Sequence, residues 1–140
     1  MFKKKSLIIT ACMMCLICLL SISAYAATRG ITSAQLGPVT LTGTIYTWED
    51  YDSVSYAYGR TGVSPNSGIQ SAYVTVKLYS YQYPSNPQST TANYTGSSLM
   101  TTSTLSVNNG THATSTHNAV VVSGGVTYTL TDPLSITENY

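Results

Sequence analysis

Apolar and polar residues alternate with a period of two in several stretches of the chain after residue 38. The first such stretch runs from Val39 to Trp48, and the longest runs from Ser71 to Tyr83. Successive side chains of a β-strand point to opposite faces of its sheet, so this period is typical of strands with one buried and one solvated face. The pattern predicts an all-β, antiparallel fold, because no segment after residue 27 gathers helix-forming residues over a helical length.

Turn-forming residues mark where the predicted strands end. A shorter alternation at Val54–Tyr58 is followed by a predicted loop over residues 61–68, which is rich in Gly, Pro, Ser and Asn. Ile69 falls on the wrong face for the strand that follows, so a β-bulge is expected near Gln70.

Two tight hairpins are predicted from turn chemistry. Asn109-Gly110 and Gly124-Gly125 can both take the positive φ angles that a type I′ turn requires. The first turn would pair Leu99–Asn108 with the stretch that follows, and the second would pair Ala119–Ser123 with Val126–Thr131. About seven short strands separated by turns predict a single β-sandwich that is immunoglobulin-like in shape.

The end of the chain adds two further expectations. Val120–Val122 has no alternation, which predicts a central strand buried on both faces. Asp132-Pro133 is expected to turn the chain into a last strand, Leu134–Glu138.

The first 26 residues have the features of a secretion signal. Lysines at positions 3–5 precede an apolar run, and Ala24-Tyr25-Ala26 places small residues where signal peptidase cuts. We therefore predict a signal peptide at residues 1–26, cleaved after Ala26, and one secreted domain at residues 27–140. The alternatives are an uncleaved membrane anchor and a lipoprotein modified at Cys12. If the signal peptide is cleaved, the protein contacts a membrane only through residues 1–26 and only before cleavage.

Cysteine and charge content restrict the compartment and the partners. All three cysteines lie at positions 12–18, so the predicted domain has no disulfide. Three of the six basic residues lie at positions 3–5, which leaves three against five acidic residues. So few charges of mixed sign argue against nucleic acid, whose backbone requires clustered Lys and Arg. A lysine-rich start and a cysteine-free domain are together typical of a bacterial export substrate.

Aromatic residues gather on the polar faces of two predicted strands. The candidate ligand-binding residues are Tyr46, Trp48, Tyr73, Tyr79, Tyr81 and Tyr83. If the two strands share a sheet, the rings form one strip that can stack on a glycan or on a surface protein. The alternative is that the rings pair across strands and stiffen a sheet that has no disulfide.

Glu49, Asp50 and Asp52 form the acidic cluster of the sequence, in the turn after the first alternating stretch. Carboxylates at this spacing are oxygen ligands of the kind that calcium accepts. The glycine and the distal glutamate of a standard calcium loop are absent, so a solvated turn is the main expectation. No cofactor is predicted, and calcium is the metal that these residues would suit.

The sequence offers little to a catalytic interpretation. His112 and His117 are its two histidines, and a spacing of five places them on opposite faces of a strand, where they cannot share a metal unless a β-bulge intervenes. No nucleophile motif is present, and a glycosidase pair would have to come from five carboxylates, three of which lie together on one turn. The domain is therefore predicted to be non-catalytic.

These observations predict an exported, non-catalytic module that binds or builds an extracellular or cell-surface structure, with a glycan or a protein as its partner. One alternative is a secreted membrane-active toxin or bacteriocin-like protein that uses Ser98–Val107 and Thr111–Val122 as an amphipathic β-hairpin. Another is a subunit of a fibre or matrix, which low charge and open sheet edges favour.

Overall fold

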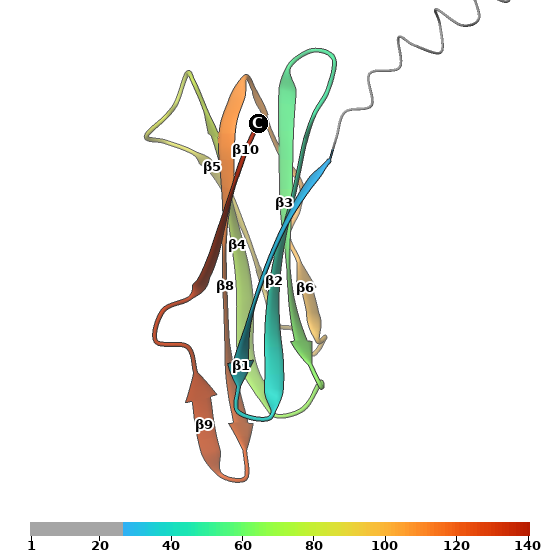
Figure 1. Cartoon of the computed structure of the whole chain (residues 1–140), viewed down its shortest axis with the longest axis vertical. Coiled ribbons are helices and arrows are strands. Elements are labelled where there is room, and N and C mark those ends of the chain that lie inside the picture. Colours follow the sequence, from blue (N-terminus) through green and yellow to red (C-terminus); the bar gives the residue numbers. More distant parts are fainter. Residues whose placement is uncertain (1–26) are drawn as a thin grey trace, which may run out of the picture.

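The computed structural model describes residues 27–140, and within this range the chain forms ten β-strands and no helix. The predicted signal peptide at residues 1–26 lies outside the described residues. The strands make two five-stranded antiparallel sheets that pack face to face (Figure 1). The prediction of an all-β antiparallel fold without a disulfide is confirmed for residues 27–140.

Sheet A has the order β1-β2-β3, with β6 and β7 paired one after the other along the far edge of β3. Its strands are β1 (Thr28–Leu36), β2 (Val39–Glu49), β3 (Val54–Ser64), β6 (Leu99–Thr101) and β7 (Leu105–Asn108).

Sheet B has the order β10-β8-β4-β5, and β9 pairs with the end of β8 beyond β10. Its strands are β4 (Ile69–Ser80), β5 (Gln88–Asn93), β8 (Gly110–Ser123), β9 (Val126–Thr129) and β10 (Leu134–Asn139).

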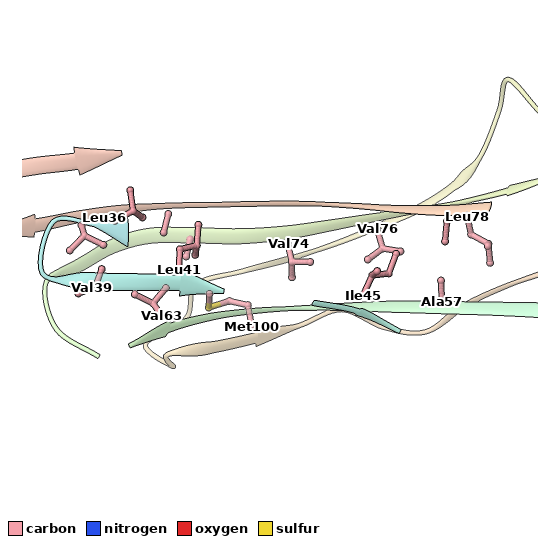
Figure 2. Close-up of a cluster of buried hydrophobic side chains, with 14 residues drawn as sticks. Leu36, Val39, Leu41, Ile45, Ala57, Val63, Val74, Val76, Leu78 and Met100 are labelled. Atoms are coloured by element: carbon pink, nitrogen blue, oxygen red, sulfur yellow. The ribbon is translucent and has the colours of Figure 1, made fainter. Parts of the chain in front are cut away.

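The core lies between the two sheets and is made by the inward-facing residues of the long strands (Figure 2). The predicted apolar faces of β2 and β4 are buried, and they supply Val39, Leu41, Ile45, Ala72, Val74, Val76 and Leu78. The inward face of β3 carries small residues instead. At Gly59, a Cβ atom would lie 2.6 Å from Val76 Cγ2 and 2.8 Å from Val74 Cγ2, so only glycine lets the sheets approach this closely.

The predicted hairpin at Asn109-Gly110 is wrong, because this turn carries the chain from one sheet to the other. β7 pairs with β3 in sheet A, whereas β8 pairs with β4 and β10 in sheet B. Asn109 has a positive φ of 50°, but Gly110 begins β8 in a tight contact with Ser55, whose Oγ accepts the Gly110 N–H at 3.0 Å. A Cβ atom at Gly110 would lie 2.5 Å from that hydroxyl, so the glycine serves close packing rather than a type I′ turn.

The same finding separates the two halves of the proposed membrane-active hairpin. Ser98–Val107 contributes β6 and most of β7 to sheet A, and Thr111–Val122 lies within β8 of sheet B. The predicted single strand from Leu99 is interrupted after Thr101, where Thr102 bonds to Gly59 through both its backbone N–H and its hydroxyl. In this fold the two segments therefore do not pair with each other as one hairpin.

Other local predictions are confirmed. Gly124 and Gly125 both have positive φ and join β8 to β9, with Ser123 opposite Val126. The pairing of β4 with β8 shifts register between Ile69 and Ser71, at the expected bulge. The strand after Asp132-Pro133 is β10.

The strand boundaries differ from expectation in three places. β3 continues to Ser64 through half of the predicted loop, and β4 ends at Ser80 instead of Tyr83. The sequence pattern does not predict β1, because the residues that it turns inward before Leu36 are small: Gly30, Thr32 and Ala34. Val120–Val122 is central as predicted, but only Val121 is fully buried.

Candidate functional site

The six aromatic residues that the sequence marks as ligand-binding lie in three separate places. Tyr46 and Trp48 lie on the outer face of sheet A, Tyr73 and Tyr79 lie on the outer face of sheet B, and Tyr81 and Tyr83 lie in the β4–β5 loop. Because β2 and β4 belong to different sheets, the single strip that would join these rings is not formed.

On sheet A, each predicted ring is paired with a ring from β3. Tyr46 stacks on Tyr58 with centroids 4.6 Å apart, and Trp48 stacks on Tyr56 at 5.1 Å, with interplanar angles of 9° and 5°. Trp48 also meets Tyr58 edge-on at 6.1 Å. Tyr56 and Tyr58 were not among the predicted site residues. Pairing the two strands as a hairpin about the 50–53 turn would have indicated them, because this register places Tyr58 opposite Tyr46 and Tyr56 opposite Trp48.

Two arginines extend this group of rings. The guanidinium carbon of Arg29 lies 5.6 Å from the centroid of Tyr46, and that of Arg60 lies 5.4 Å from the centroids of both Tyr46 and Tyr58. These are cation–π distances. We call the six residues the aromatic strip: Arg29, Tyr46, Trp48, Tyr56, Tyr58 and Arg60.

The stacked geometry decides what the rings of the strip can do. Each ring of a parallel pair covers a face of its partner, so those faces are not open to a sugar ring. Cross-strand aromatic pairs stabilise a sheet. For Tyr46 and Trp48 the geometry therefore favours the stiffening role over sugar stacking.

The acidic turn beside the strip is organised by Asp50. Its Oδ1 accepts the backbone N–H groups of Asp52 at 3.0 Å and Val54 at 2.9 Å, and its Oδ2 accepts the hydroxyl of Tyr56 at 2.8 Å. The hydrogen bond from Val54, with those from Tyr56 and Asp52, holds the pKa of Asp50 below its ordinary value. The hydrogen bond that the Tyr56 hydroxyl donates to Asp50 raises the pKa of Tyr56.

This arrangement does not provide the predicted metal site. Within residues 27–140, no group of three or more His, Cys, Asp or Glu side chains is placed to hold a metal ion. Glu49 points to the inner side of the hairpin, opposite Ser55, while the two oxygens of Asp50 accept from its own turn and from Tyr56 on β3. Glu49, Asp50 and Asp52 are therefore not brought together as ligands.

The outer face of sheet B has a different composition. Ser135, Thr116, Thr75 and Thr91 form a row of hydroxyl groups across β10, β8, β4 and β5, with Thr75 Oγ1 and Thr91 Oγ1 2.8 Å apart. Tyr79 stacks on His112 at 4.2 Å. His112 thus lies on the outer face and His117 on the inner one, as their spacing predicts.

His117 is completely buried between the sheets. The hydroxyl of Thr61 donates to the carbonyl of Tyr73 at 3.1 Å, so its oxygen accepts from His117 Nδ1 at 2.7 Å. Nε2 is then unprotonated and accepts the hydroxyl of Ser115 at 2.8 Å. Burial lowers the pKa of His117 to about 4. A neutral, fully hydrogen-bonded imidazole sealed in the core is structural.

A pocket of about 290 Å³ lies where the β4–β5 loop passes the end of β7. It is lined by Val54, Leu78, Ser80, Gln82, Tyr83, Asn86, Gln88, Ser106, Val107 and Asn108. The base of the pocket is apolar and includes Leu78, which is fully buried. The exposed rim carries amide and hydroxyl groups. No charged residue lines the pocket, and Tyr83 is the predicted site residue that it includes.

Backbone contacts hold the loop over this pocket. The N–H of Tyr83 bonds to the carbonyl of Ser80 at 3.2 Å and reaches its hydroxyl at 3.3 Å, and the N–H of Asn86 bonds to the carbonyl of Tyr83 at 3.4 Å. Tyr81 N–H bonds to the carbonyl of Asn109, which links the loop to the corner between the sheets. The pocket joins three segments that are distant in sequence, which is why the sequence pattern did not reveal it.

Comparison of the chain with protein-family models, with curated proteins and with solved structures found no match. In the part of the chain that the structure describes, no helix has the length and apolar character needed to span a membrane.

Proposed function

We propose that this protein is an exported, non-catalytic module that binds a neutral glycan in the pocket beside Tyr83. The observation that carries the proposal is the lining of the pocket, which combines an apolar base with an uncharged rim of amide and hydroxyl groups. Ligand sites commonly have this composition, with a few polar groups fixing the orientation of the ligand.

The chemistry of the rim matches that of a sugar. Gln82, Asn86, Gln88 and Asn108 each offer an amide that can both donate and accept, and sugar hydroxyls do the same. Among residues 27–140, these four side chains have no hydrogen-bond partner, so their bonding capacity is open to a ligand. The half-buried Val54 and Val107 provide apolar surface for the C–H groups of the ring.

Tyr83 supplies an exposed aromatic ring, which the stacked rings of sheet A do not. Its side chain is 55 % exposed, whereas Tyr46 and Trp48 are covered by their cross-strand partners. An aromatic ring at the edge of a polar pocket gives a sugar an apolar surface on which to pack. The pocket carries no carboxylate pair of the kind that glycoside hydrolysis uses, which is consistent with binding rather than turnover.

Export supports the choice of a glycan, since the predicted signal peptide would deliver the domain to a compartment where cell-wall and surface polysaccharides are available. The immunoglobulin-like shape belongs to the same proposal, because domains of that architecture present their loops at the ends of the sheets for recognition. The β4–β5 loop is such a connection.

The test is binding of the secreted protein to neutral polysaccharides and to cell-wall material, measured by calorimetry. Tyr83→Ala and Asn86→Ala should each weaken binding by about tenfold, because each removes a contact worth roughly 1.4 kcal/mol. Tyr81→Ala is the matched control, since Tyr81 is more exposed, at 79 %, but does not line the pocket. The proposal fails if the Tyr83→Ala and Tyr81→Ala variants bind the glycan with equal affinity. It also fails if the wild-type protein binds no neutral glycan.

A further inference from the structure

The aromatic strip has the composition of a protein interface. Trp, Tyr and Arg are the residue types that most often dominate the energy of protein–protein contacts. Here all six members of the strip are of these types and lie on one face of sheet A. Its rings are also held in place by stacking, so binding costs little side-chain entropy.

Charge is distributed unevenly along this face. Arg29 lies opposite Tyr46, and Arg60 lies one outward-facing pair further from the turn, so that both cations are at one end of the strip. Asp50 and Asp52 lie at the other end, in the 50–53 turn. Asp50 lies four positions after Tyr46 along the chain, which corresponds to about 14 Å of extended strand. Trp48 and Tyr56 lie between the two ends.

A strip with this distribution of charge is complementary to a second copy of itself that runs in the opposite direction. If two copies face each other with their strands running in opposite directions, the Arg29–Arg60 end of each copy lies over the Asp50–Asp52 end of the other. The rings about Trp48 then meet in the centre. This is the geometry of an isologous contact, in which one two-fold axis generates both sets of charge pairs.

We propose that the aromatic strip is a homodimer interface, with a two-fold axis crossing the strands near Trp48. The two A sheets pack face to face, as aligned sheets do elsewhere in proteins. A polyanion fits this face less well, because the carboxylates of Asp50 and Asp52 would repel it. A second copy supplies both the cations and the anions that the face requires, so charge complementarity selects it as the occupant.

Arg60 adds a reason why this face is built for contact. Its Nε atom is buried and has no hydrogen-bond partner among residues 27–140, while its guanidinium rests on Tyr46 and Tyr58. The stacked guanidinium is held in a fixed orientation, and a planar, oriented guanidinium is suited to a carboxylate. In the dimer the carboxylate is supplied by the turn of the other copy.

The test uses the secreted protein and complementary charge reversals. Asp52→Arg and Arg29→Glu change exposed side chains, and each places like charges together twice in a homodimer. Each variant alone should raise the dissociation constant of the dimer by about tenfold or more, measured by analytical ultracentrifugation. Mixing the two variants should restore dimers, because in the heterodimer the arginine introduced in one copy faces the glutamate introduced in the other. Lys77→Glu, on the outer face of sheet B, is the control with the same charge change as Arg29→Glu and should leave dimerisation unaltered.

Trp48 provides a second readout, since it is the single tryptophan of the chain. Its emission should shift to shorter wavelength with increasing protein concentration, and the shift should weaken at high salt. Wild-type protein that stays monomeric at all concentrations would overturn the proposal. A dimer unaffected by both reversals would also overturn it, and would point to association through a sheet edge instead.

Discussion

The outer faces of the two sheets follow the same alternation in sequence but have different surfaces. Sheet A is covered by two stacked ring pairs and two arginines, whereas sheet B carries rows of Thr and Ser and one stacked pair, Tyr79 with His112. Next to the stacked rings, Thr44 lies on the outer side of β2 opposite Arg60 and is only 6 % exposed. Hydroxyl rows leave the sheet hydrated. Period-two alternation therefore tells which side of a strand faces outward, but not what that side is for.

The largest effect should come from the interior that both faces share. His117 has a folded-state pKa of about 4 against an ordinary 6.5, so protonation favours the unfolded chain. Its contribution to stability is complete above pH 6.5 and is lost as pH falls toward 4, amounting to about 3 kcal/mol over that window.

Urea titrations at pH 7 and pH 5 measure this effect. Wild-type protein should lose about 2 kcal/mol between these pH values through His117. His112→Gln, on the outer face, should keep the full loss, and His117→Gln should reduce it. An equal loss in all three proteins would mean that other groups carry the pH dependence, and direct NMR titration of the His117 ring would then decide its pKa.

The second prediction compares the two faces directly. Trp48→Ala should lower the free energy of unfolding by about 2 kcal/mol, less than the roughly 3–5 kcal/mol of a core aromatic because the ring is half-buried. Tyr79→Ala removes a ring with one stacking partner and should cost about 1 kcal/mol. Thermal and urea unfolding check the order. Equal losses would show that the stacked pairs of sheet A add nothing beyond what sheet B has.

The smallest effect is expected from calcium. The carboxylate of Asp50 is occupied by two backbone N–H groups and a phenol, so millimolar calcium should leave the melting temperature unchanged. Saturating ligand at a hundredfold its dissociation constant would add about 2.7 kcal/mol, which a melting curve would reveal. If calcium raises the melting temperature, and the double variant Asp50→Asn with Asp52→Asn abolishes that rise, the acidic turn is a metal site.

Local features were predictable because short-range sequence determines them. Side-chain alternation along a strand predicts the buried face of β4 and the bulge beside Ile69. The backbone conformation that glycine allows predicts the Gly124-Gly125 turn. The opposite orientations of His112 and His117 follow from their spacing on one strand.

Sheet membership was not predictable in the same way, because it depends on contacts between distant segments. Asn109-Gly110 has the composition of a hairpin turn, and only the packing of Gly110 against Ser55 makes it a corner. The burial of His117 depends on Gly43 of the opposite sheet, where a Cβ atom would lie 2.4 Å from the imidazole. Neither contact leaves a trace in the neighbouring sequence.

The order of strands along the chain has a consequence for folding in time. β1, β2 and β3 are consecutive and pair with their neighbours, so the larger part of sheet A needs only residues 28–64. β4, in contrast, needs β8, which follows three intervening strands. Local pairing forms in microseconds, whereas topologies dominated by distant pairing take milliseconds to seconds. A chain that emerges from its N-terminus would therefore complete the β1–β3 meander early and hold the inner face of β2 open to water until the last third of the sequence arrives to cover it.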